Sequence, residues 1–216
     1  MNKRVINIVI LSISFILVAV FGAKQYKDKL QYERYLSFSL TNDISSFAAA
    51  TVTARNDLEE IIANEQITLE QADLLQSKFQ NIFTEGERII VLAEEWLKLK
   101  EQEGGVVVPY PVYMSVNFSN YIMRLEFFDS QSLALSGEQV EKLELMKAVL
   151  DEWAEAIESN MTGIRAPRKR ATIVTTEYLD AYRDNMLKSH DWLEMLKQIQ
   201  SSSKQFDRAV ESSFMY

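Results

Sequence analysis

The side chains that could support catalysis or bind a metal are few, and the sequence does not group them. His190 is the only histidine and there is no cysteine, so the recurring His- and Cys-rich spacings of metal sites cannot form. The pairs Glu59-Glu60 and Glu94-Glu95 are typical of solvated helix faces, and the sequence has no D-x-D-x-D-G calcium loop. It also has no nucleophile elbow, phosphate-binding loop or dinucleotide-binding glycine pattern. We therefore expect no catalytic residue, no metal and no cofactor, and a protein that is not an enzyme. A hydrolase with two carboxylates stays open, because the fold rather than the spacing brings such pairs together.

A short basic cluster interrupts a chain that is otherwise acidic. It consists of Arg165, Arg168, Lys169 and Arg170. The first 30 residues carry a net charge of +4 and the whole chain −8, so residues 31–216 carry −12. A body with this charge has no broad surface for nucleic acid. The simplest interpretation of the cluster is a solvated loop between helices. The functional one is a membrane-proximal patch that contacts anionic headgroups, at about 1 kcal/mol per basic residue; proteolytic processing is a third.

A second segment combines apolar and aromatic side chains without any charge. It contains Val106, Val107, Val108, Tyr110 and Tyr113, together with two prolines. The prolines indicate an extended, non-helical conformation. Such a loop either covers the end of the fold and completes its core, or forms an interface loop that contacts the membrane or a partner, because exposed apolar runs of this length usually have a purpose.

The longest apolar run of the chain lies at its N-terminus. Val5–Ala23 contains nineteen residues and no charge, after a short basic head at residues 1–4. As a helix it would span about 28 Å, close to the hydrocarbon thickness of a bilayer. A cleaved signal peptide is the alternative, but the run exceeds the usual signal length and a good A-x-A cleavage site is missing. The sequence therefore predicts a transmembrane anchor over residues 5–23, with the lipid bilayer as a partner.

The orientation of this anchor follows weakly from charge. Lys3 and Arg4 precede it, and Lys24, Lys27 and Lys29 follow it, so the positive-inside rule gives little asymmetry. A basic head of four residues is normally retained while the following domain is exported. We expect a single-pass protein of the cell membrane, with a cytoplasmic N-terminus and an extracytoplasmic body.

The elements that position these segments are helices. Six glycines and three prolines in 216 residues indicate long helices with few turns. The sequence predicts an all-α protein in which the transmembrane helix continues into an acidic helical domain at residues 24–216. That domain is a five-helix, bundle-like unit, with helices at roughly 24–63, 69–102, 115–134, 137–160 and 175–212.

The first two of these helices carry heptad seams typical of a coiled coil. The first seam contains Leu40, Ile44, Phe47, Thr51, Ala54, Leu58 and Ile61, and the second contains Ala72, Leu75, Phe79, Ile82, Gly86, Ile89, Ala93 and Trp96. They predict an antiparallel helical hairpin, with Gly86 marking close approach of the partner backbone. Thr68 with Gln71 and Ser136 with Gln139 predict capping boxes. Alternating helix directions would return the two loops, 105–114 and 164–172, to the membrane side.

Together these features favour a membrane-anchored helical interaction or scaffold protein of the cell envelope, without catalytic activity. We expect a protein partner in the membrane or envelope and no nucleic acid. A homodimer through residues 30–60 is compatible with the seam, although the second helix can fill that seam instead. The alternative function is an extracytoplasmic helical bundle that senses a ligand and signals through a separate membrane partner.

Overall fold

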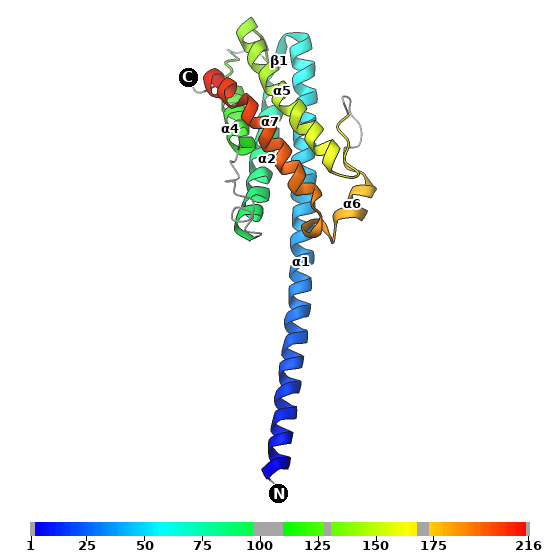
Figure 1. Cartoon of the computed structure of the whole chain (residues 1–216). Helices are drawn as coiled ribbons and strands as arrows, with labels where there is room; N and C mark the ends of the chain where they lie inside the picture. Colours follow the sequence, from blue (N-terminus) through cyan, green and yellow to red (C-terminus); the bar gives the residue numbers. More distant parts are fainter. Residues whose placement is uncertain (1–2, 97–109, 128–130, 168–172, 215–216) are drawn as a thin grey trace.

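The structure is a computed structural model that describes residues 3–96, 110–127, 131–167 and 173–214, with side chains of the first range described from Leu11 to Glu94. It is all-α, as expected, apart from one short pair of strands. Figure 1 shows one long helix whose lower part projects from the body as a stalk and whose upper part belongs to a helical bundle.

This long helix, α1, runs without interruption over Lys3–Asn64. In the bundle its seam is buried as predicted, because Leu40, Ile44, Leu58 and Ile61 have no exposed surface. The seam packs on α2 (Leu69–Val91) and on α5 (Gly137–Asn160) of the same chain. The second helix therefore occupies the seam, as the sequence allowed. Among the described residues, with side chains beginning at Leu11 in α1, no helix is both long and apolar enough to cross a membrane.

The turn between α1 and α2 is compact and built from local signals. Glu65 has a left-handed backbone, with φ of +48°, and the chain then forms strand β1 at Gln66–Thr68. This strand pairs antiparallel with β2, Ser132–Ala134, with Ile67 opposite Leu133. Both predicted capping boxes are confirmed: the first opens α2 and the second opens α5. α2 ends in a short π-helix, η1, at Leu92–Trp96.

The third helix begins earlier and ends earlier than the sequence predicted. It is α4, Tyr110–Met123, rather than 115–134. The prediction was wrong about the prolines, because Pro111 lies in the first helical turn, where its missing N–H has no helical partner to lose. The helix stops before residues 132–134, because these pair with β1 as the second strand. α5 has the predicted bounds.

The predicted last helix, 175–212, is broken into three pieces. These are α6 (Thr176–Tyr182), the 3₁₀-helix η2 (Met186–Lys188) and α7 (Asp191–Phe214). The break follows from contacts with α1. The Thr41 hydroxyl lies 3.0 Å from the carbonyl oxygen of Tyr182, and the Leu187 N–H donates to the Ser37 hydroxyl over 3.3 Å. Backbone groups that would continue a helix are thus satisfied by another element, which a local periodicity cannot reveal.

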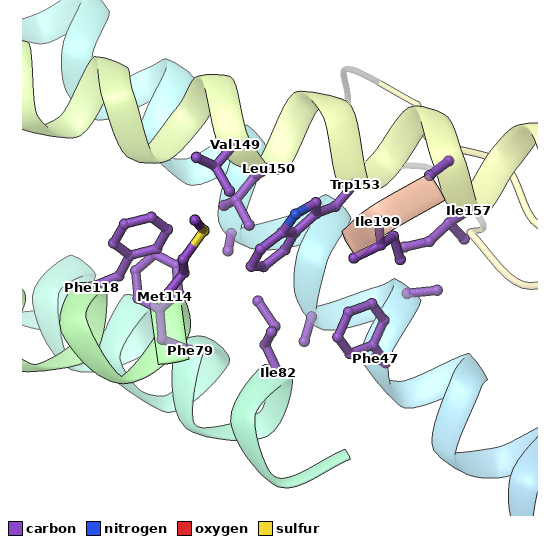
Figure 2. Close-up of a cluster of buried hydrophobic side chains, with 14 of the residues drawn as sticks. Phe47, Phe79, Ile82, Met114, Phe118, Val149, Leu150, Trp153, Ile157 and Ile199 are labelled. Carbon is purple, nitrogen blue, oxygen red and sulfur yellow. The ribbon is translucent and has the colours of Figure 1, made fainter. Parts of the chain in front are cut away.

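The core lies where α1, α2, α4, α5 and α7 meet, and Trp153 of α5 is at its centre (Figure 2). Its ring stacks on that of Phe47 at a centroid distance of 6.4 Å, and its indole N–H donates to the Ser203 hydroxyl over 2.8 Å. A Cβ added at Gly86 would meet the side chains of Phe47 and Val112 at 3.5 Å, which is ordinary contact. The expected approach of a partner backbone at Gly86 is therefore wrong; side chains fill this space.

Candidate functional site

The described half of the apolar-aromatic segment belongs to the bundle. Tyr110 begins α4, Pro111 is buried, and the side chains of Val112 and Tyr113 are half-buried and pack against the core. Val106, Val107 and Val108 lie outside the described residues. Because Val112 lies beside Gly86 and level with Phe47, it sits about 36 Å beyond Ala23 along α1. This position favours the interpretation that the segment completes the core over one in which it enters a membrane.

The flanks of the basic cluster are held on the side of the bundle. Arg165 donates its N–H to the Ile173 carbonyl over 2.9 Å, beside a bridge between residues 164 and 174. The buried Arg55 of α1 donates to the carbonyls of Ala166 and Pro167 over 3.1 and 2.7 Å. Arg55 is about 48 Å beyond Ala23 along α1, and the described flanks of the cluster are held at this height. The remaining members, Arg168, Lys169 and Arg170, lie outside the described residues.

Within the described ranges, no group of three His, Asp or Glu side chains is arranged to hold an ion. His190 is exposed beside the start of α7.

The feature best suited to bind another molecule is one that we did not predict from the sequence. A groove of about 330 Å³ lies between α1 and α2, near the lower end of the bundle. Its α1 wall has Leu36, Ser39, Leu40 and Asp43, and the other wall has Glu87, Arg88, Val91 and Leu92. This volume is at the lower end of the range found for ligand pockets in proteins. We refer to it as the α1–α2 groove.

Two carboxyl groups meet near the upper end of this groove: Asp43 is part of its lining, and Glu85 lies beside Asp43. The side chains of Asp43 and Glu85 are each 17% exposed, and the two are placed to share a hydrogen bond when one of them is protonated. Burial, that hydrogen bond and the charge of Glu85 raise the pKa of Asp43 to about 6, against a smaller lowering by Arg88. The Arg88 Nη1 lies 3.1 Å from the Glu85 Oε2 and 3.8 Å from the Asp43 Oδ1. One guanidinium therefore forms ion pairs with two carboxyl groups. Asp43 retains its proton to a higher pH than an isolated carboxyl group does.

Another face of α1 is fastened by α6 and η2. The Tyr178 hydroxyl donates to the Thr41 carbonyl over 2.7 Å, and Lys188 forms an ion pair with Glu33 at 3.7 Å. Burial is the main cause that raises the pKa of the Tyr178 hydroxyl, and Asp43 is among the charges that add to the shift. The rotation of α1 is thus fixed by these contacts, so that Asp43 faces α2.

The groove could have been found from the heptad pattern. Asp43 and Glu85 each precede a seam residue, Ile44 and Gly86 respectively. Residues that flank the seams of two paired helices face one another and commonly carry charges. Opposite charges are the usual case, so two acidic residues at such positions are the informative signal. Chemically, the groove can accept hydrogen bonds from a cation and bury an apolar group beside it.

Comparisons of this chain with family models, with curated proteins and with solved structures found no match.

Proposed function

We propose that this protein is a membrane-anchored, non-catalytic helical interaction protein of the cell envelope. The observation that carries the proposal is the contrast between the two ends of α1. The upper end is part of the core, whereas the lower end bears large apolar side chains that are 53–75% exposed: Leu11, Ile13, Phe15, Ile16, Leu17, Val18, Val20 and Phe21. Leaving such surface in water costs about 25 cal/mol per Å², so it needs an apolar environment. In sequence the run extends back to Val5, which gives the length that a bilayer requires.

The length of the stalk determines how far the bundle would lie from the membrane surface. From Ala23 to Leu40, the first α1 seam residue with no exposed surface, there are seventeen residues, or about 25 Å of helix. Because α1 is continuous across this distance, the bundle is displaced from the apolar run by a rigid element rather than by a linker. We propose a cytoplasmic N-terminus and an extracytoplasmic bundle, which would meet partners above the membrane surface.

The alternative function, a ligand-sensing bundle, is favoured by the α1–α2 groove. A small ligand that binds there would stabilise the folded state by mass action. A rise in melting temperature with a soluble ligand, in the absence of any other protein, would distinguish a sensor from an interaction module.

Membrane fractionation with an alkaline wash tests the anchor. We expect the protein to stay in the membrane pellet, and the variant Leu17→Asp to move to the wash, because an acidic residue near the centre of a span costs about 2.5–3.5 kcal/mol. The matched control is Leu74→Asp, at a side chain 48% exposed on α2, which should leave the distribution unchanged. Complete release of the unmodified protein by the wash would contradict the proposal.

A further inference from the structure

We propose that the α1–α2 groove docks a helix of another membrane protein, which places a lysine or arginine against Asp43 and Glu85. The proposal rests on the proposed function, because it requires that α1 be anchored in the same membrane as the partner. It adds the site of the interaction, the form of the partner and the charge that the partner must carry.

A continuous face of α1 leads from the membrane end of the stalk into the groove. Tyr32, Leu36, Ser39 and Asp43 are spaced by four, three and four residues, so they lie on one face of the helix. The last three line the groove, and the Tyr32 side chain, 44% exposed, lies one turn below it. Tyr32 is about 14 Å beyond Ala23. A helix rising from the bilayer beside α1 would therefore follow this face directly into the groove.

The shape of the groove suits the side chains of such a helix. Leu36 and Leu40 of α1 oppose Val91 and Leu92 at the end of α2. Apolar side chains from a partner helix would be buried between these walls. At the upper end the lining changes from apolar side chains to Asp43 and Glu87. A lysine or arginine of the partner could bury its apolar stem between the walls and place its charged end beside these carboxylates.

The two carboxyl groups near the upper end of the groove carry more negative charge than their neighbouring cation balances. Asp43 and Glu85 have one nearby cation in the described structure, Arg88, whose side chain is 60% exposed. A second cation would balance the remaining negative charge and would form charge-assisted hydrogen bonds with both carboxylates. In a groove with apolar walls such an interaction is screened less than at an open surface.

The α1 helix of a second copy does not meet these requirements. Two α1 helices anchored in one membrane run parallel, so the Asp43 of one would lie level with the Asp43 of the other. The nearest basic residue of α1 below Asp43 is Arg34, nine residues or about 14 Å lower. Like charges would face each other, which is destabilising. A second α1 helix is therefore a poor occupant, and we assign the groove to a helix of a different protein.

Site-specific photo-crosslinking in intact membranes tests this. Benzoylphenylalanine is introduced at Tyr32 in the full-length protein, and the control position is Gln31, which is also exposed but faces about 100° away around the helix. We expect one adduct of discrete mass from Tyr32 and at least fivefold less from Gln31. The crosslinked peptide should flank a transmembrane span of the partner and contain a lysine or arginine.

Charge variants decide whether the carboxyl pair is the recognition element. Asp43→Asn and Glu85→Gln keep shape and hydrogen bonding, and each should lower the Tyr32 adduct at least fivefold. The control Asp57→Asn removes a carboxylate that α1 pairs with Lys78 of α2, and should leave the adduct unchanged. Replacing the partner's basic residue by glutamate should abolish the adduct, and Asp43→Lys should restore it. Circular dichroism of each variant verifies that it is folded.

The outcomes separate this proposal from the proposed function. A protein that resists the alkaline wash but yields no Tyr32 adduct would overturn the docking proposal alone. An adduct between two copies of this chain, an intramolecular link to residues 97–109, or an adduct insensitive to Asp43→Asn would also overturn it. Release by the wash would overturn the proposed function itself.

Discussion

Asp43 of α1 and Glu85 of α2 lie within hydrogen-bonding reach of each other across the helical hairpin, at positions where paired helices usually bring opposite charges together. Arg88 contacts both from the exposed side, at 3.8 and 3.1 Å. The two helices thus hold an excess of negative charge at the lower end of the bundle, beside a groove with apolar walls. The two like charges repel each other in the folded state, and such locally unfavourable arrangements are more common at functional sites than elsewhere.

The stability of the bundle should depend on pH through Asp43. Its pKa in the folded state is about 6, above the ordinary value of 3.8, so folding favours its protonated form. The resulting stabilisation is complete below about pH 3.8 and is lost as the pH rises through 6. Asp43→Asn should therefore be more stable than the wild type at pH 7.5 by about 1–2 kcal/mol, a value below the full conversion of the pKa difference because Arg88 and water screen the pair.

Thermal melts at pH 4.5 and pH 7.5 measure this difference, which should be small at the lower pH. Asp57→Asn is the matched control, because Asp57 has a lysine partner, Lys78; its removal should not stabilise the protein at pH 7.5. Equal behaviour of the two variants would refute the assignment of the raised pKa to Asp43.

The hydrogen bond between Trp153 and Ser203 should contribute measurably to stability. Both side chains are fully buried, and the indole N–H donates to the Ser203 hydroxyl over 2.8 Å. Ser203→Ala leaves this N–H without its acceptor, which we expect to cost about 1–3 kcal/mol. Denaturant unfolding checks the value, with Ser201→Ala on the exposed face of α7 expected within about 0.5 kcal/mol of the wild type. A loss at Ser203 no larger than that at Ser201 would count against the bond.

Arg55 should protect the basic segment from proteolysis. Its guanidinium donates to two carbonyls of the segment and lies 3.8 Å from Asp151. Arg55→Met removes these contacts while keeping an apolar stem, so trypsin should cleave within residues 165–170 at least fivefold faster. Arg208→Met, at an exposed position on α7, is the control, and limited proteolysis followed by mass spectrometry locates the cleavage. Unchanged cleavage in Arg55→Met would show that the segment is held by other contacts.

The sequence predicts those parts of the fold whose causes are local. The seam from Leu40 to Ile61 and the capping boxes at Thr68 and Ser136 depend on spacing within one helix, and they are confirmed. The start of α4 was missed because a proline forbids the interior of a helix but not its first turn. The break between α6 and α7 was missed because Ser37 and Thr41, far away in sequence, bind the interrupted backbone.

The α1–α2 groove was not predicted because it also depends on residues that are far apart in the sequence. Asp43 and Glu85 are each unremarkable among many acidic residues, and their meeting depends on the register of the α1–α2 hairpin. Conversely, the two loops that looked functional in sequence have their described parts packed on the bundle, at Arg55 and at Gly86. Composition left open whether the apolar segment completes the core or forms an interface, and the described contacts favour the first interpretation.

The most direct test of the central claim is whether the chain crosses a membrane with its N-terminus on the cytoplasmic side. The sequence has no cysteine, so single cysteines can be introduced without background: Asn2→Cys in the head and Ser201→Cys on the exposed face of α7. A maleimide that does not cross membranes should label the second in intact cells, and the first only after permeabilisation. Labelling of both positions in intact cells, or of neither, would contradict an anchor that crosses the membrane and holds the bundle outside.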